Sequence, residues 1–192
     1  MQVYLIRHAE SSDNARGLRV RLSRTAFNTW LQEADVAPLT PRGFEQAQRL
    51  VAELSSTSIE RIYTSPCTRA LTTATILGHA RNLEPLILPD LREIMPPALK
   101  ESENTAPLFQ HFLHGYLRLL RPHPSHEWLL TAYQRVGRVW DEITREPANT
   151  IAVVSHLAFL RLLLGALRFQ DRWRSGPYHL HNGGVTCVWS VK

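Results

Sequence analysis

The sequence of 192 residues contains little lysine and little cysteine. Lys100 and Lys192 are its two lysines, so arginine supplies nearly all of the 22 basic residues and of the net charge of +5. No dense basic run of the nucleic-acid-binding kind is present, and we expect no nucleic-acid partner. The two cysteines, Cys67 and Cys187, match no metal-binding spacing and do not make a disulfide framework.

Long apolar segments are also absent. No apolar run reaches the roughly 18–20 residues that a membrane-spanning helix needs, so we expect no membrane partner. Arg7 and His8 interrupt the first apolar run too early for a secretory signal, and we therefore expect a cytoplasmic protein. With 44% hydrophobic and 20% charged residues, the composition is that of a globular domain with a substantial core.

The most informative stretch is residues 3–14, VYLIRHAESSDN. Its first four residues suit a buried strand, and the apolar run stops abruptly at Arg7 and His8. Ligands of open parallel sheets bind at the carboxyl ends of the strands. A guanidinium, an imidazole and small polar groups at such a point suit an anion such as a phosphoryl group. The alternative is a charged strand end that faces solvent.

Predicted strands and helices alternate along the chain. Thr40-Pro41 and Ser65-Pro66 have the cap-and-proline pattern of helix starts. This alternation predicts a single α/β domain over residues 1–192, a three-layer α/β/α sandwich with a mostly parallel central sheet. We expect strands at residues 1–7, 61–64, 84–90, 150–155 and 185–191, and helices that follow Thr40 and Ser65 and that occupy residues 106–120, 125–145 (capped by Ser125) and 157–167.

An extended connection over residues 15–39 interrupts this alternation. Thr25 could cap a short helix there that carries Phe27 and Trp30 on one side. Connections of this length are uncommon without a role. The segment is therefore either a surface excursion docked by the two aromatics or a flap over the pocket. In the second case one arginine would meet substrate, from the set Arg19, Arg21 and Arg24.

A helical cap segment is expected within residues 95–124, where prolines bracket the helix.

Three predicted strand ends carry cationic or titratable side chains. Arg7 and His8 end the first strand, His156 ends the strand at 150–155, and Arg69 lies in the first helical turn after Ser65. Free amides and the helix dipole favour an anion at such a turn. Parallel strands would bring all of these groups to one edge of the sheet.

Six segments in this order resemble those of the histidine phosphatase superfamily, also called the phosphoglycerate-mutase-like fold, in its phosphatase branch. They are RHAES with Asn14 beyond it, PLTPRGFEQA, IYTSPCTRALTTA, LRE, VVSHLAFLRLLL and NGGVTCVW. Ala9 and Leu157 stand where glycine is usual, and no tryptophan-glutamate-glycine segment follows Glu93. These departures leave the substrate open rather than the chemistry.

The residue types predict a mechanism, and the resemblance implies the same one. A neutral His8 would attack a phosphoryl group to give a phosphohistidine, and Glu93 would protonate the leaving alkoxide, with Glu10 and Glu127 as the next candidates. The substrate would be a small phosphorylated metabolite, with no metal or cofactor. The groups expected to stabilise the phosphoryl oxygens are Arg7, Asn14, Arg69 and His156.

Three other functions stay open. Phosphoglycerate-mutase-type transfer is disfavoured because residues 95–124 offer few basic groups, namely Lys100, Arg118 and Arg121. A protein phosphohistidine phosphatase is disfavoured by the helical cap segment. A non-catalytic phosphate-binding module, from a different functional class, is disfavoured by the joint presence of the four candidate catalytic and binding residues His8, Arg69, Glu93 and His156.

Other residues have structural and functional interpretations. His111 with His114 and His123 with His126 have a spacing that zinc sites sometimes use, although a solvated pocket rim is the preferred interpretation. We interpret Cys67 as a packing residue. The sequence leaves the oligomeric state open, and a homodimer could use Phe27, Trp30 and Trp173.

Overall fold

A six-stranded sheet, in the strand order β4-β3-β6-β1-β8-β7, runs through the computed structural model, which describes residues 1–124 and 126–191. Its first four strands are parallel, whereas β8 is antiparallel to β1 and β7 is antiparallel to β8. The sheet is therefore mostly parallel, as the sequence predicts. The strands are β1 (Gln2–Arg7), β3 (Arg61–Thr64), β4 (Leu86–Ile87), β6 (Thr150–Ser155), β7 (Trp173–Ser175) and β8 (Val185–Ser190).

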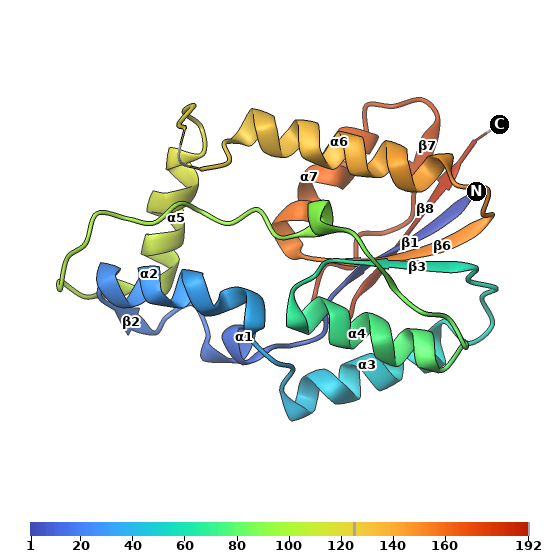
Figure 1. The fold of residues 1–192 in the computed structure, drawn as a ribbon, viewed down its shortest axis with the longest axis horizontal. Coiled ribbons are helices and arrows are strands. Elements are labelled where there is room, and N and C mark those ends of the chain that lie inside the picture. Colours follow the sequence, from blue (N-terminus) through green and yellow to red (C-terminus); the bar gives the residue numbers. More distant parts are fainter. Residues whose placement is uncertain (125, 192) are drawn as a thin grey trace.

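Helices cover both faces of this sheet (Figure 1). On one face, α3 (Pro41–Glu53) and α4 (Thr68–His79) pack Leu50 and Leu77 against Ile6 of β1. On the other, α6 (Leu129–Arg145) and α7 (Leu157–Leu167) pack against Leu5. When helices cover both faces of a sheet, the side chains on both sides of each strand are buried. This explains the uninterrupted apolar runs in β1 and β6. The three-layer α/β/α prediction is confirmed.

The two irregular segments, 15–39 and 95–124, come together in one cap beyond the end of the sheet (Figure 1). Their short strands, β2 (Arg21–Leu22) and β5 (Ala106–Pro107), pair antiparallel. Four buried side chains form a separate core between their helices, namely Phe27, Trp30, Leu99 and Leu108. The cap elements are α1 (Ser12–Arg16), β2, α2 (Arg24–Glu33), η1 (Ala34–Val36), β5 and α5 (Leu108–Arg118).

Some local predictions differ from the structure. Ser23, not Thr25, is the N-cap of α2, because its side chain accepts a hydrogen bond from the Ala26 amide. The strand predicted over 84–90 is only two residues long, since the chain turns into the 3₁₀ helix η2 (Pro89–Leu91). Ser125 lies outside the described residues, and α6 begins at Leu129 with Trp128 as its N-cap. The sequence also gave no sign of β7.

The expected interface aromatics are buried within this chain. Phe27 is fully buried, Trp30 is 8% exposed and Trp173 is 5% exposed. These side chains complete the cores of their own chain and are not exposed for an interface, whereas the homodimer itself stays a prediction. Among the residues that the structure describes, none of the helices has the length and apolar character needed to cross a membrane.

Candidate active site

The residues predicted at the strand ends meet at one edge of the sheet. His8 follows β1, His156 follows β6, and Arg69 lies in the first turn of α4 after β3. The ring centroids of His8 and His156 are 5.0 Å apart, and Arg69 Nε donates to His8 Nε2 at 3.2 Å. All three side chains are buried. Burial of three titratable or charged groups in contact is costly unless they share a function.

The proton of His8 is fixed by its two partners. Nδ1 lies 2.7 Å from the carbonyl oxygen of Ala9, which can only accept, so Nδ1 carries the hydrogen. Arg69 Nε can only donate, so His8 Nε2 presents its lone pair. Burial, followed by the charge of Arg69, holds the pKa of His8 well below its ordinary value. His8 is therefore a neutral imidazole whose Nε2 lone pair accepts from Arg69, so this bond must be released before Nε2 can attack a substrate.

His156 is held by the end of the next strand. Its Nε2 is 2.8 Å from Ser65 Oγ, which also accepts from the Cys67 amide. Its Nδ1 is buried and has no hydrogen-bond partner among the described residues. Burial and then the proximity of His8 lower the pKa of His156. Ser65 is thus a partner of His156 rather than the helix cap we predicted, and α4 begins at Thr68 after Cys67.

The two arginines of the site keep donors for a ligand. Arg69 donates one terminal NH to the carbonyl of Ala34, and Arg7 donates one to Leu180 O at 2.9 Å. Arg7 Nε is buried without a partner in the part of the chain that the structure describes. A buried guanidinium with unused donors is suited to bidentate binding of an oxyanion.

Asn14 lies at the cavity, and a residue that the sequence analysis missed holds it there. Asn182 donates to Asn14 Oδ1 at 2.8 Å and to the carbonyl of His8 at 3.2 Å. Asn14 Oδ1 also accepts from the Ser11 amide at 3.2 Å. With its oxygen occupied, Asn14 has its side-chain NH₂ available for a ligand. Asn182 belongs to the NGG segment of the family resemblance, which could have drawn attention to it.

Glu93 lines the same cavity as His8 and accepts hydrogen bonds from the N-terminus of α7. Oε1 accepts from the amides of Phe159 at 3.1 Å and Ile94 at 3.0 Å, and Oε2 is 3.3 Å from the amide of Ala158. Burial raises the pKa of Glu93, and the backbone hydrogen bonds oppose this rise. A carboxyl with a raised pKa beside a nucleophile is suited to general acid catalysis.

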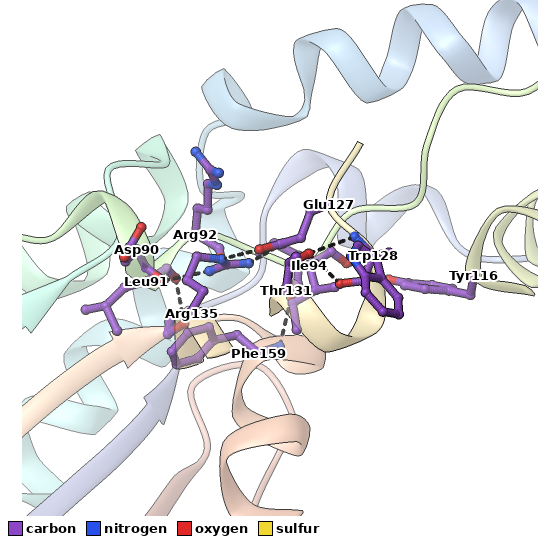
Figure 2. A network of polar contacts seen from close by, with 12 residues as sticks. Asp90, Leu91, Arg92, Ile94, Tyr116, Glu127, Trp128, Thr131, Arg135 and Phe159 are labelled. Carbon is purple, nitrogen blue, oxygen red and sulfur yellow. Dashed lines mark hydrogen bonds and ion pairs between the residues drawn. The ribbon is translucent and has the colours of Figure 1, made fainter. Parts of the chain in front are cut away.

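A buried arginine braces the segment that carries Glu93 (Figure 2). Arg135 of α6 makes two 2.7 Å contacts to the carboxylate of Glu127, and it donates to the carbonyls of Asp90 at 2.6 Å and Arg92 at 3.0 Å. Its guanidinium also lies 5.8 Å from the ring centroid of Phe159. Arg135 therefore fixes the backbone immediately before Glu93.

This arrangement bears on the alternative acids. Glu127 is committed to Arg135, and Glu10 accepts from Thr40 Oγ1 at 2.9 Å while lying 3.6 Å from Arg42. Neither carboxylate lines the cavity, whereas Glu93 does. Glu93 is thus the better placed candidate.

All of the candidate residues except His156, which is fully buried and is not among the lining residues, line one cavity of about 970 Å³. Arg7, His8, Asn14, Arg69 and Glu93 all contribute to its surface. Above them the wall consists mainly of apolar side chains from α2, α5 and α7. Arg161 of α7 is an additional lining residue that the sequence analysis did not single out.

Other candidates from the sequence lie elsewhere. Arg19, Arg21 and Arg24 are absent from the described cavity lining, and Arg21 donates to Thr105 O at 2.7 Å. His111 is buried, bonds the carbonyl of Leu22 at 2.9 Å and stacks on Phe27.

The second histidine pair with a zinc-like spacing is His123 with His126. The rings of His123 and His126 stack with centroids 4.7 Å apart. In residues 1–124 and 126–191, no group of three or more histidine, cysteine, aspartate or glutamate side chains is placed to hold a metal ion. Cys67 lies 3.1 Å from Asp35 Oδ1, and burial raises the pKa of its thiol, which suits a packing residue better than a nucleophile.

Fold and site together define an α/β domain with a cluster of histidine and arginine side chains at the carboxyl edge of its parallel strands. Residues 3–190 match the family model of the histidine phosphatase superfamily (branch 1), and the chain belongs to this superfamily. Phosphoserine phosphatase 1 of Hydrogenobacter thermophilus is 29% identical over 98% of this chain and 86% of its own length.

Solved structures of other proteins superimpose on this chain. The alpha-ribazole phosphatase from Shigella flexneri superimposes with a TM-score of 0.63 at 28% identity, covering 87% of this chain and 79% of its own. YhfR from Bacillus stearothermophilus superimposes with a TM-score of 0.68 at 24% identity, covering 97% of this chain and 89% of its own. The second likeness is evidence of the fold alone.

Proposed function

We propose that the protein is a metal-independent phosphatase that hydrolyses a small phosphomonoester through a phosphohistidine on His8. The single observation that carries this proposal is the state of His8. Its Nδ1 hydrogen is held by Ala9 O, its pKa is lowered, and its Nε2 carries the lone pair, which accepts from Arg69 Nε in the cavity that Arg7 also lines. The names of the relatives, which include phosphoserine and alpha-ribazole phosphatases, support phosphatase activity.

In the first step, His8 Nε2 forms a bond to phosphorus as the bond to the leaving oxygen breaks. Arg7, Arg69 and His156 donate to the phosphoryl oxygens, with Asn14 as a further donor. Loss of one such preorganised donor typically costs about 3–4 kcal/mol of transition-state stabilisation. Glu93 transfers its proton to the leaving alkoxide, which departs as the alcohol.

In the second step, water attacks the phosphohistidine. The ionised Glu93 accepts a proton from this water as the phosphorus–nitrogen bond breaks, and His8 is restored as a neutral imidazole. Inorganic phosphate leaves, and Glu93 is protonated again for the next turnover. Every charge in this cycle is balanced by arginines and by one carboxyl, so the proposal needs no metal.

The structure also bears on the alternatives. A mutase must hold a second phosphate, yet Lys100, Arg118 and Arg121 are not among the lining residues, and Arg118 donates to Ala98 O at 2.8 Å. A protein phosphohistidine would have to pass under the cap of α2 and α5. A non-catalytic module would gain nothing from the raised pKa of Glu93 opposite a neutral His8.

Trapping of the intermediate tests the proposal. Wild-type protein incubated with a ³²P-labelled monoester and quenched should carry acid-labile, base-stable label. His8→Ala should carry none, and its turnover should fall by at least about 10³-fold, as expected when a nucleophile is removed. Label on the His8→Ala protein would show that His8 is not the acceptor.

Chelation tests the metal-free part of the mechanism. Because arginines surround the proposed phosphoryl position, turnover should be unchanged after dialysis against EDTA. Loss of turnover in EDTA with recovery in zinc or magnesium would reject this part of the proposal while leaving the His8 labelling result to stand.

A further inference from the structure

The upper part of the cavity is an apolar vestibule, which we define by Trp30, Phe109, Phe112, Tyr116, Leu120 and Leu162. It is continuous with the phosphate-binding residues, since one cavity of about 970 Å³ includes both. Small-molecule pockets commonly span about 300–1,000 Å³, so this cavity is at the large end of the range. A phosphoryl group with a three-carbon alcohol would leave most of it empty.

The aromatic rings in the wall of the vestibule pack against one another and present apolar surface. The ring centroids of Trp30 and Phe112 are 5.3 Å apart, and those of Phe112 and Tyr116 are 5.9 Å apart. Trp30 Nε1 donates to Asp13 Oδ1 at 2.7 Å, and the Tyr116 hydroxyl donates to Ile94 O at 3.3 Å. With their polar atoms already bonded, these rings offer apolar surface rather than hydrogen bonds to a ligand.

The rim of the vestibule is apolar and exposed to solvent. Phe109 is 46% exposed, Leu120 is 59% exposed and Leu129 is 42% exposed. All three line the cavity. A group of large apolar side chains beside a polar site marks a surface that a ligand covers.

Charges in the lining argue against a small acidic alcohol. Beyond Arg7 and Arg69, the only further arginine or lysine among the described lining residues is Arg161, which is exposed. The carboxylate residue Asp13 also lines this cavity. A substrate with its own carboxylate would gain one solvent-screened partner and would approach one like charge.

We propose that the substrate is a phosphomonoester whose alcohol part is large and apolar, with an alkyl or aryl group that fills the vestibule. This proposal rests on the phosphatase function above and adds the substrate class. The phosphoryl group binds at His8, and the apolar group covers the aromatic wall and the exposed rim, from which it displaces water.

A series of n-alkyl phosphates tests this class. From n-propyl to n-octyl phosphate the basicity of the leaving alkoxide hardly changes, so chain length varies mainly the buried apolar surface. Each fully buried methylene is worth about fourfold in binding. We expect kcat/KM to rise at least tenfold over the series, and phosphoserine and 3-phosphoglycerate to fall below n-propyl phosphate. A flat series, or phosphoserine or phosphocholine above n-octyl phosphate, would overturn the proposal.

Rim variants localise the effect. Phe109→Asp and Leu120→Asp place a charge at the vestibule on exposed positions where the fold tolerates it, and each should lower the octyl-to-propyl ratio of kcat/KM at least fivefold. Leu113→Asp is the matched control, because Leu113 is 58% exposed on α5, the helix that carries Phe109, but does not line the cavity. Equal ratios in all three variants and the wild type would reject the vestibule as the binding surface.

Binding of phosphonates separates this proposal from the phosphatase function. Calorimetry should show n-octylphosphonate binding at least tenfold more tightly than n-propylphosphonate, and neither ligand requires turnover. Protein that hydrolyses no monoester, including p-nitrophenyl phosphate, but keeps this preference would refute the phosphatase function alone. Protein that hydrolyses p-nitrophenyl phosphate but binds the two phosphonates equally would refute the substrate class alone.

Discussion

The phosphate-binding end of the cavity and the vestibule above it are built in opposite ways. The first consists mainly of charged and titratable side chains at or just after the ends of strands β1, β3 and β6, together with Asn14 of α1 and Glu93 after η2. The second consists of apolar side chains from two excursions, joined by the β2–β5 pair. The first end holds the groups that the proposed chemistry uses, and the second end would set which alcohol is accepted.

Because the two ends of the cavity are built from different elements, the groups proposed for the reaction and the groups proposed to select the substrate can vary separately. The strand-end groups are held by the sheet and by contacts such as that of Ser65 with His156. The cap has its own small core around Phe27, separate from the two cores that flank the sheet. Substitutions in the cap can therefore change the vestibule with little effect on the geometry at His8. The predictions below test this separation, from the largest expected effect to the smallest.

Glu93→Gln should have the largest effect. It removes the proton donor but leaves the arginines that bind phosphate. General acid catalysis is worth roughly 10²–10⁴-fold, so phosphoryl transfer from an alkyl phosphate should slow by that range. Transfer from p-nitrophenyl phosphate should slow less, because p-nitrophenolate leaves readily without a proton.

Burst kinetics measure the two cases without interference from the hydrolysis step. Rapid mixing with p-nitrophenyl phosphate reports the first release of nitrophenol, and quenched mixing reports transfer from the alkyl substrate. Equal slowing of both bursts would mean that Glu93 positions phosphate or supports α7 through its bonds to the Ala158 and Phe159 amides.

Arg135→Met should destabilise the fold and loosen the Glu93 segment. Removal of one partner of a buried ion pair typically costs about 3–5 kcal/mol, and we expect the lower end because Glu127 is 23% exposed. Urea denaturation measures the change in the free energy of unfolding. Arg138→Met, at an exposed position of the same helix, is the control and should change it by less than about 0.5 kcal/mol. A similar loss in both variants would show that the contacts of Arg135 with Glu127 and the Glu93 segment do not account for its effect.

The two buried histidines make stability depend on pH. Their folded pKa values are depressed, so the unfolded chain binds protons first as the pH falls below 6.5, and the folded state loses stability. Between the unfolded and the folded pKa each histidine contributes a slope of about 1.4 kcal/mol per pH unit. Glu93, whose pKa is raised, acts in the opposite direction.

His8→Asn isolates one of these contributions. The slope of the free energy of unfolding below pH 6.5 should decrease by about the value for one histidine relative to wild type. His79→Asn, at an exposed position, is the control and should keep the wild-type slope. A wild-type slope in His8→Asn would mean that His8 is not held neutral.

The same contrast explains what the sequence could predict. His8, Arg69 and His156 each follow a strongly patterned apolar run, so local signals located them and the parallel topology placed them together. Asn182 and Arg135 escaped notice because their roles depend on partners more than 40 positions away, at Asn14 and at Asp90. In the cap, the pairing of segments 15–39 and 95–124 depends on aromatic contacts across about 80 positions, which no local pattern encodes.

The smallest expected effect concerns the N-cap of helix α2 in the cap region. The sequence predicted Thr25 at this position, and the structure has Ser23 there. Ser23 Oγ accepts from the Ala26 amide at 3.1 Å, so Ser23→Ala should lower the free energy of unfolding by about 1 kcal/mol. Thr25 Oγ1 instead donates to Glu103 at 2.6 Å in an exposed position. Thr25→Ala should therefore cost less than about 0.5 kcal/mol, partly because alanine favours a helix interior. Urea unfolding of the two variants under one set of conditions compares them directly. A larger loss for Thr25→Ala than for Ser23→Ala would show that Thr25 is the N-cap of α2, as the sequence predicted.

The same variant tests whether the cap region acts separately from the end of the cavity that contains His8. In that case Ser23→Ala should leave the burst rate with p-nitrophenyl phosphate unchanged, because Ser23 makes no hydrogen bond to His8 or Arg69 in the part of the chain that the structure describes.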